Sequence, residues 1–153
     1  MLVPAPRNVR TTFAFFPPEN SPAAWQASLE TFTTALERAF PGAVLTHRVD
    51  PLRGLDVMDF DVEVAPDVWI TGRAAMPEPD YAYVTAGNAT ADEAALFAQW
   101  LRDSYLPSPA VVWFNTSAAM ENGMETPSPL PATGDSSEIE AFFRNHLASA
   151  GVE

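Results

Sequence analysis

Two neighbouring segments in which apolar and polar residues alternate constrain the fold of this chain most. They span residues 55–64 and 68–75 and are separated only by Ala65-Pro66-Asp67. Successive side chains of a β-strand point to opposite faces, so the alternation predicts two strands with one buried face and one open face. If 65–67 forms a three-residue hairpin loop, Val64 lies opposite Val68 and the pairing of the other residues follows.

This register separates the polar side chains of the hairpin from the apolar ones. The core side takes Phe60, Val62, Val64, Val68 and Ile70. The other side carries three carboxylates about 7 Å apart, which we call the acidic ladder: Asp59 lies opposite Arg73, Asp61 opposite Thr71 and Glu63 opposite Trp69. The alternation slips once, at Val57-Met58, and this phase change predicts a β-bulge there.

Periodicity and capping signals predict the other elements. Strands are expected at 9–16, 43–49, 81–85 and 110–115, and helices at 21–40, at 90–105 and from 135 onward. Thr90 and Glu93 have the spacing of a capping box, and Ser21-Pro22 is a capping residue followed by proline. Residues 116–134 are rich in Pro, Gly, Ser and Thr, and are expected to form a long loop that is either functional or poorly ordered.

The order of these elements predicts a single α+β domain over residues 1–153. We expect a largely antiparallel sheet of five to six strands with two or three helices packed on one face. Four strands in succession favour a meander. The strands that follow the first two helices are expected to add parallel neighbours at its edges.

Charge and composition disfavour several classes of function. Asp and Glu number 20 against 8 basic residues, which gives a net charge of −12, and there is no Cys. Such a field repels nucleic acids and anionic lipids and attracts cationic partners. The N-terminus lacks the charged and apolar regions of a signal peptide, and no apolar stretch approaches the roughly 20 residues that span a bilayer. We therefore expect a cytoplasmic protein that binds neither nucleic acid nor membrane.

Motifs of catalysis and of cofactor binding are missing from the sequence. There is no nucleophile elbow, no H-E-x-x-H motif and no Walker-type loop. His47 shares a predicted strand face with Leu45 and Val49, which favours a partly buried structural role, and His146 is expected at the surface or in packing. The sequence therefore predicts a protein that is not an enzyme and that holds no cofactor and no metal.

The acidic ladder has three possible interpretations. It can be an ordinary solvated face in which Arg73 offsets Asp59. It can also be an interface for a partner with a basic surface, because rigid rings supply contact area and charges steer association. A metal site is disfavoured, because ligands along a straight strand diverge. The interface would consist of Asp59, Asp61, Glu63, Trp69, Arg73, Tyr81 and Tyr83.

A second candidate site lies where the strand 110–115 enters the long loop. Loops at strand ends often carry binding residues, and Met provides an adaptable contact surface. The candidates are Asn115, Met120, Glu121 and Met124. The alternative is a plain connector held by prolines.

Small size, strong acidity, a helix-flanked meander and the absence of a catalytic set together resemble the immunity proteins that neutralise bacterial toxins. The residues behind the resemblance are the acidic ladder, Trp69 and the strand with Tyr81 and Tyr83. It implies a cytosolic inhibitor that masks the surface of a cognate toxin, and it carries over no residue roles. Two alternatives stay open: a small-ligand module or minor enzyme with a cleft between the sheet and the 116–134 loop, and a secretion chaperone or adaptor.

Overall fold

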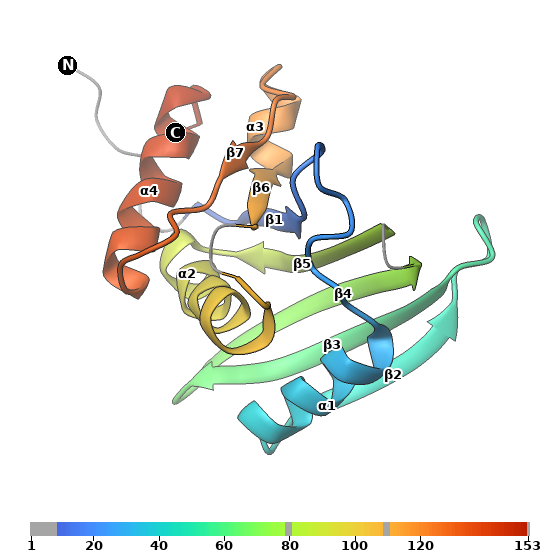
Figure 1. Ribbon diagram of the computed structural model, residues 1–153. Coiled ribbons are helices and arrows are strands. Elements are labelled where there is room, and N and C mark those ends of the chain that lie inside the picture. The colour runs from blue at the N-terminus through green and yellow to red at the C-terminus, as the bar shows by residue number, and fades with distance from the viewer. Residues whose placement is uncertain (1–8, 79–80, 109–110, 153) are drawn as a thin grey trace.

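A computed structural model describes residues 9–78, 81–108 and 111–152. Within these residues it contains an antiparallel sheet of seven strands and four α-helices, so the fold is α+β as predicted (Figure 1). The strands are β1 (Thr11–Phe16), β2 (Val44–Val49), β3 (Asp56–Ala65), β4 (Val68–Glu78), β5 (Tyr81–Ala89), β6 (Trp113–Thr116) and β7 (Ser128–Pro129). The helices are α1 (Leu29–Ala39), α2 (Ala91–Trp100), α3 (Ser117–Glu121) and α4 (Ser136–Ser149), and a π-helical turn, η1 (Leu101–Tyr105), continues α2.

The strand order of the sheet is β2-β3-β4-β5-β1-β6-β7. The predicted meander is present as β2 to β5, and β1 lies between β5 and β6. The expectation of parallel edge strands was wrong, because β2 pairs antiparallel with β3 and β6 pairs antiparallel with β1. The sheet also exceeds the expected five to six strands, since the two-residue β7 adds to β6.

Helices α1, α2 and α4 pack on one face of the sheet through aromatic side chains. Phe60 of β3 contacts Phe97 of α2 and Phe32 of α1, with ring centroids 5.5 and 5.8 Å apart. Phe13 of β1 contacts Phe143 of α4 at 4.7 Å. These rings are buried, so the core lies between this face of the sheet and the three helices (Figure 1).

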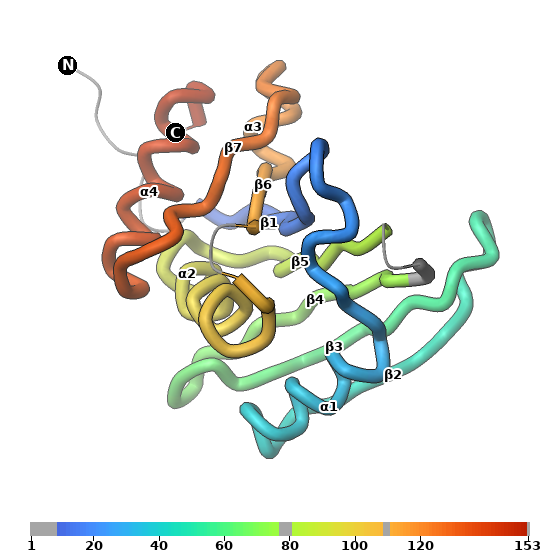
Figure 2. The backbone as a smooth tube through the Cα atoms, in the orientation of Figure 1, coloured from blue at the N-terminus to red at the C-terminus, as the bar shows by residue number. Residues whose placement is uncertain are grey.

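The first helix begins later than the sequence predicts. Ser28 caps α1 in a capping box with Thr31, and Gln26 just before it has a positive φ of 48°, which a helix does not tolerate. Trp25 is 1% exposed and donates its indole N–H to the carbonyl of Val111 at 2.8 Å. The tube in Figure 2 shows this connection crossing the sheet on its way from β1 to α1. Trp25 therefore fills the core from an irregular segment.

The predicted β-bulge at Val57-Met58 was wrong in position. Both residues pair in unbroken register with β2 and β4, and both are buried, on opposite faces. The register shifts between Glu63 and Ala65 instead, so that Ala65 lies opposite Val68 and Pro66-Asp67 makes a two-residue turn. Asp67 adopts a positive φ of 62°, a conformation that Asp tolerates in turns.

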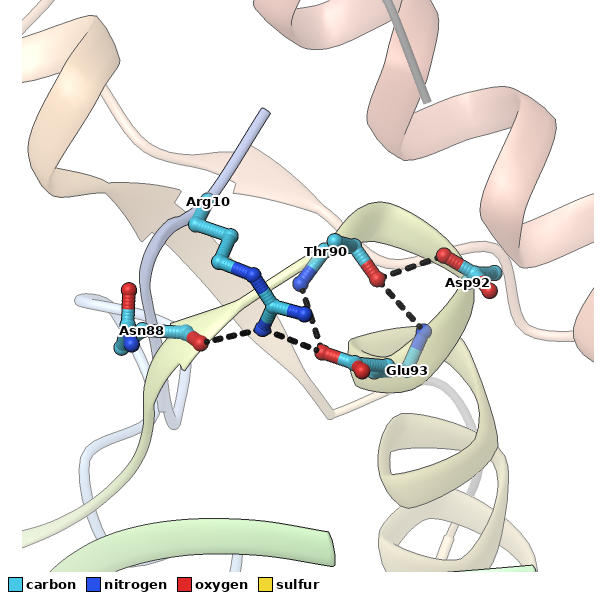
Figure 3. Close-up of polar contacts among 5 residues, drawn as sticks. All are labelled: Arg10, Asn88, Thr90, Asp92 and Glu93. Atoms are coloured by element: carbon cyan, nitrogen blue, oxygen red, sulfur yellow. Dashed lines mark hydrogen bonds and ion pairs between the residues drawn. The ribbon is translucent and has the colours of Figure 1, made fainter. Parts of the chain in front are cut away.

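The second helix starts at its predicted capping box. The Thr90 hydroxyl accepts the Glu93 N–H at 3.4 Å, and Glu93 accepts the Thr90 N–H at 3.1 Å. Figure 3 shows Arg10 reaching the same Glu93 carboxylate and the carbonyl of Asn88, each at 3.0 Å. The residue that precedes β1 is thereby tied to the start of α2.

The segment 116–134 is not one irregular loop, because it contains α3 and β7. Thr116 caps α3 by accepting the Ala119 N–H at 3.1 Å. The buried guanidinium of Arg102 donates to the carbonyls of Pro131, Thr133 and Gly134, which fixes the end of the segment. Asp135 then caps α4 at the predicted position.

We expect Gly72→Ala to destabilise the protein by about 3 kcal/mol, because an added Cβ would overlap the carbonyl oxygen of Thr85 and the ring of Phe60. Gly42→Ala is the matched control, since no atom lies within 4 Å of its Cβ position. It should change the free energy of unfolding by less than about 0.5 kcal/mol. Urea unfolding of both variants measures the difference, and equal stabilities would contradict the packing described for Phe60.

Candidate interface on the open face of the sheet

One face of the sheet points away from α1, α2 and α4, and we call it the open face. Because side chains alternate along each strand, the residues that directly precede and follow a core residue lie on the open face. Asp59 pairs with Arg73 and Arg73 with Thr85, so these three side chains form a row across β3, β4 and β5. The predicted pairs of Asp61 with Thr71 and of Glu63 with Trp69 are also confirmed.

Asp59 lies between two arginines on the open face. Its carboxylate accepts from Nε of Arg48 at 2.6 Å and from Nε of Arg73 at 2.9 Å. The hydrogen bond from Arg48 is the largest cause that holds the pKa of Asp59 below its usual range, and Arg73 lowers it further against the opposing effect of burial. The sequence did not point to Arg48, because the alternation within β2 leaves the register of that strand against β3 undetermined.

The other two ladder residues also bond within the chain. Asp61 accepts the hydroxyl of Thr71 at 2.5 Å, and Glu63 accepts the N–H of Asp67 at 3.1 Å. The three carboxylates of the ladder carry three negative charges and Arg48 and Arg73 carry two positive ones, so these five side chains have a net formal charge of −1. Together with these two arginines, the acidic ladder forms a nearly neutral hydrogen-bonded network, and most of the chain's negative charge lies elsewhere.

A shallow hollow of about 580 Å³ lies in the middle of the open face. Small residues line its floor: Thr12, Thr71, Thr85 and Gly87. A Cβ at Gly87 would stand 3.2 Å from the carbonyl of Thr71, so the absence of a side chain keeps this part of the sheet low. The open face is thus a surface with a depressed centre and higher rims.

Exposed aromatic residues lie on the same face as this hollow, and Tyr83 lines it. Trp69 is 48% exposed and Tyr81 41% exposed, which is unusual for rings of this size. Tyr83 lies beside Tyr81, with ring centroids 6.4 Å apart. The four predicted partners Trp69, Arg73, Tyr81 and Tyr83 therefore lie on one face with the acidic ladder.

Phe16 and Trp113 belong to the same face and were missed. They pair across β1 and β6. Phe15 pairs with Val84, so one step further along this register Phe16 stands beside Tyr83. Tyr83, Phe16 and Trp113 form an aromatic row over three strands. Alternation along the strands indicates this face, because Phe16 directly follows the buried Phe15 and Trp113 directly precedes the buried Phe114.

The second predicted site does not form a cluster around Asn115. Asn115 is buried and structural: its side chain donates to the carbonyl of Met124 at 3.2 Å and accepts the Thr116 N–H at 2.8 Å. Met120 and Glu121 are exposed on α3. Only Asn115 and Met124 of the four candidates are joined by a hydrogen bond among the described residues.

The two histidines lie in different environments. His47 is exposed on the edge strand β2, so its expected burial was wrong. His146 of α4 is buried, packs on Phe114 with ring centroids 4.8 Å apart and shares a hydrogen bond of 3.2 Å with the hydroxyl of Thr116. Burial lowers the pKa of His146. Its expected packing role fits this position.

Neither a ligand cluster for a metal ion nor a helix that could span a membrane occurs in the part of the chain that the structure describes. No group of three or more His, Asp or Glu there is placed to hold an ion, and no helix is long and apolar enough to cross a bilayer. No protein-family model, no curated protein and no solved structure matches the chain. The proposed function therefore rests on the geometry.

We expect the stabilising effect of the Asp59 carboxylate to depend on pH. Its pKa is lowered in the folded state, so its contribution is fully present above the unfolded pKa of about 3.9 and is lost as the pH falls through the folded pKa. Asp59→Asn should therefore be less stable than the wild type at neutral pH, and the gap should close in acid. Urea unfolding over a pH series measures it.

The matched control for Asp59 is Glu37→Gln, which removes an exposed carboxylate of α1 that makes no ion pair among the described residues. At neutral pH its free energy of unfolding should lie within about 0.5 kcal/mol of that of the wild type. A gap for Asp59→Asn that stays constant down to the lowest pH would show that the ion pairs with Arg48 and Arg73 do not stabilise the fold.

We expect acid to destabilise the protein through His146. Its folded pKa is lowered, so the unfolded chain binds a proton below about pH 6.5 while the folded one resists it, and stability falls as the pH falls. His146→Phe keeps the ring contact with Phe114 and should flatten the pH dependence of unfolding between about pH 7 and 5. A slope that survives in His146→Phe would contradict this assignment.

Proposed function

We propose that this chain is a non-enzymatic binding protein of the immunity type, which neutralises a toxic partner protein by covering its surface with the open face. One observation carries the proposal. The open face, which α1, α2 and α4 leave uncovered, presents Trp69 and Tyr81, two large rings that are each more than two-fifths exposed. Exposed Trp and Tyr are the residues most often responsible for affinity at protein interfaces.

The polar groups of this face favour a rigid interface. Asp59, Asp61 and Glu63 already hold partners within the chain, so docking does not require their rearrangement. Two arginines hold Asp59 in place, and β3, the strand that carries it, is paired on both sides. A preorganised surface loses less conformational entropy on binding than a mobile one.

Net charge supports a basic partner. The acidic ladder itself contributes little, because Arg48 and Arg73 offset it. The chain as a whole carries −12, and a field of this size speeds the approach of a cationic protein from any side. Association should therefore slow as salt rises, whereas the contacts of Trp69 and Tyr81 should set the lifetime of the complex.

Affinity capture from the native cell with the double variant Trp69→Ala/Tyr81→Ala tests the interface. We expect the captured partner to bind this variant roughly 30-fold more weakly or worse, since a ring that dominates an interface contributes about 2 kcal/mol or more. The matched control is Leu52→Ala, which removes an exposed apolar side chain from the turn between β2 and β3, outside the open face. It should bind like the wild type, as measured by titration calorimetry.

The inhibitory part of the proposal has its own test. The captured protein, produced alone, should arrest growth, and co-production of this chain but not of its double variant should restore it. A partner that binds the double variant as tightly as the wild type would remove the open face from the proposal. A partner that is harmless, or that binds only as an unfolded chain, would instead favour an adaptor or secretion chaperone.

A further inference from the structure

A second hollow opens at the end of β1, where the aromatic row ends. Its volume is about 800 Å³, and Phe16 and Trp113 line it together with Pro17 and Pro127. Glu19 follows on the turn after β1 and also lines it. The hollow thus lies between the sheet and the segment around Pro127, and it continues the open face because Phe16 stands beside Tyr83.

The lining of this hollow combines apolar surface with one charge. Phe16 and Trp113 are each only partly buried, which leaves part of each ring in reach of a ligand. Glu19 is exposed, and its carboxylate forms no ion pair or hydrogen bond with any described residue. This sets Glu19 apart from the ladder carboxylates, which are all engaged within the chain.

We infer that this hollow binds the guanidinium group of an arginine side chain, presented by the partner that the open face covers. A guanidinium stacks on the face of Trp or Phe and forms two parallel hydrogen bonds with a carboxylate, and Glu19 is the carboxylate on this wall. The apolar stem of the same side chain has Pro17 and Pro127 to pack on. The net charge of −12 favours a cation here over an anion.

Arginine fits this lining better than lysine does. The lysine ammonium is compact and strongly hydrated, whereas the planar guanidinium stacks on rings and loses less hydration when it does so. A neutral planar group would stack equally well, but it would leave the Glu19 carboxylate without a charged partner. The two rings and the single carboxylate therefore select for a group that is both flat and positive.

The biological role of this subsite rests on the proposed function, but its affinity does not, so a small probe tests it. The probe is N-acetyl-arginine N-methylamide, titrated into the full chain whose Trp side chains carry ¹⁵N. We expect a saturable shift of the Trp113 indole N–H signal, with a dissociation constant in the millimolar range typical of one side chain. Trp113→Phe assigns the signal, and the Trp69 indole, outside the hollow, serves as the internal control.

Two comparisons separate charge from stacking in the same titration. The matching citrulline derivative is flat but neutral, and it should bind at least several-fold more weakly than the arginine derivative. Glu19→Gln should reduce the affinity for the arginine derivative by a similar factor and leave the affinity for citrulline unchanged. Glu37→Gln, an exposed change on α1, controls for the loss of one negative charge.

The inference is overturned if the Trp113 signal shows no saturable shift, if citrulline binds as tightly as arginine, or if Glu19→Gln and Glu37→Gln behave alike. The inference would also be overturned if N-acetyl-lysine N-methylamide bound the chain more tightly than the arginine derivative does. None of these results touches the capture experiment with Trp69→Ala/Tyr81→Ala. Conversely, arginine binding to a chain that captures no partner would leave the subsite intact and reject the proposed function.

Discussion

The ring of Phe60 stacks on Phe97, with an interplanar angle of 21°, and the rest of the structure depends on this contact. Phe60 pairs with Gly72 across β3 and β4, and its ring occupies the space where a side chain at Gly72 would stand. The same ring meets Phe32 of α1 edge-on. One residue of the central hairpin thus joins the sheet to two helices, and it does so on one face only.

That one-sided packing determines what the other face can be. Along β3 each core residue alternates with a ladder residue, so fixing Phe60 and Val62 inward fixes Asp59, Asp61 and Glu63 outward. A carboxylate on such a face needs partners or water. Here the neighbouring strands β2 and β4 supply two arginines and a threonine hydroxyl, so the polar half of the open face is satisfied internally.

Local signals predicted part of this arrangement and distant pairings decided the rest. The hairpin register followed from alternation and a short turn, even though the turn is one residue tighter than expected. The caps at Thr90 and Asp135 were readable because they involve neighbours in sequence. The place of β1 between β5 and β6, and that of β2 beside β3, depend on contacts between distant residues. Neither the position of Arg48 beside Asp59 nor that of Phe16 beside Tyr83 could therefore be predicted.

The first helix begins later than the sequence predicts, and this difference has a related physical cause. Trp25 has the spacing of a helical stripe with Leu29 and Phe32. In the structure its indole N–H donates to the carbonyl of Val111, and a helix that began at Ser21 would not orient the side chain for this bond. Tertiary hydrogen bonding outweighed local periodicity there.

The two ends of the open face differ in how many of their charged and aromatic groups already have partners within the chain. Around Asp59 the charges are paired, so little electrostatic energy is left for a partner. Toward Tyr83, Phe16 and Trp113 the rings are partly exposed, and Glu19 forms no ion pair with any described residue. Under the proposed function, a partner would gain most by placing apolar and cationic groups at the aromatic end and by lying flat over the paired end. The nearly neutral network around the ladder would then act as a rigid floor that fixes orientation, and the exposed rings of Trp69, Tyr81 and the aromatic row would supply the affinity.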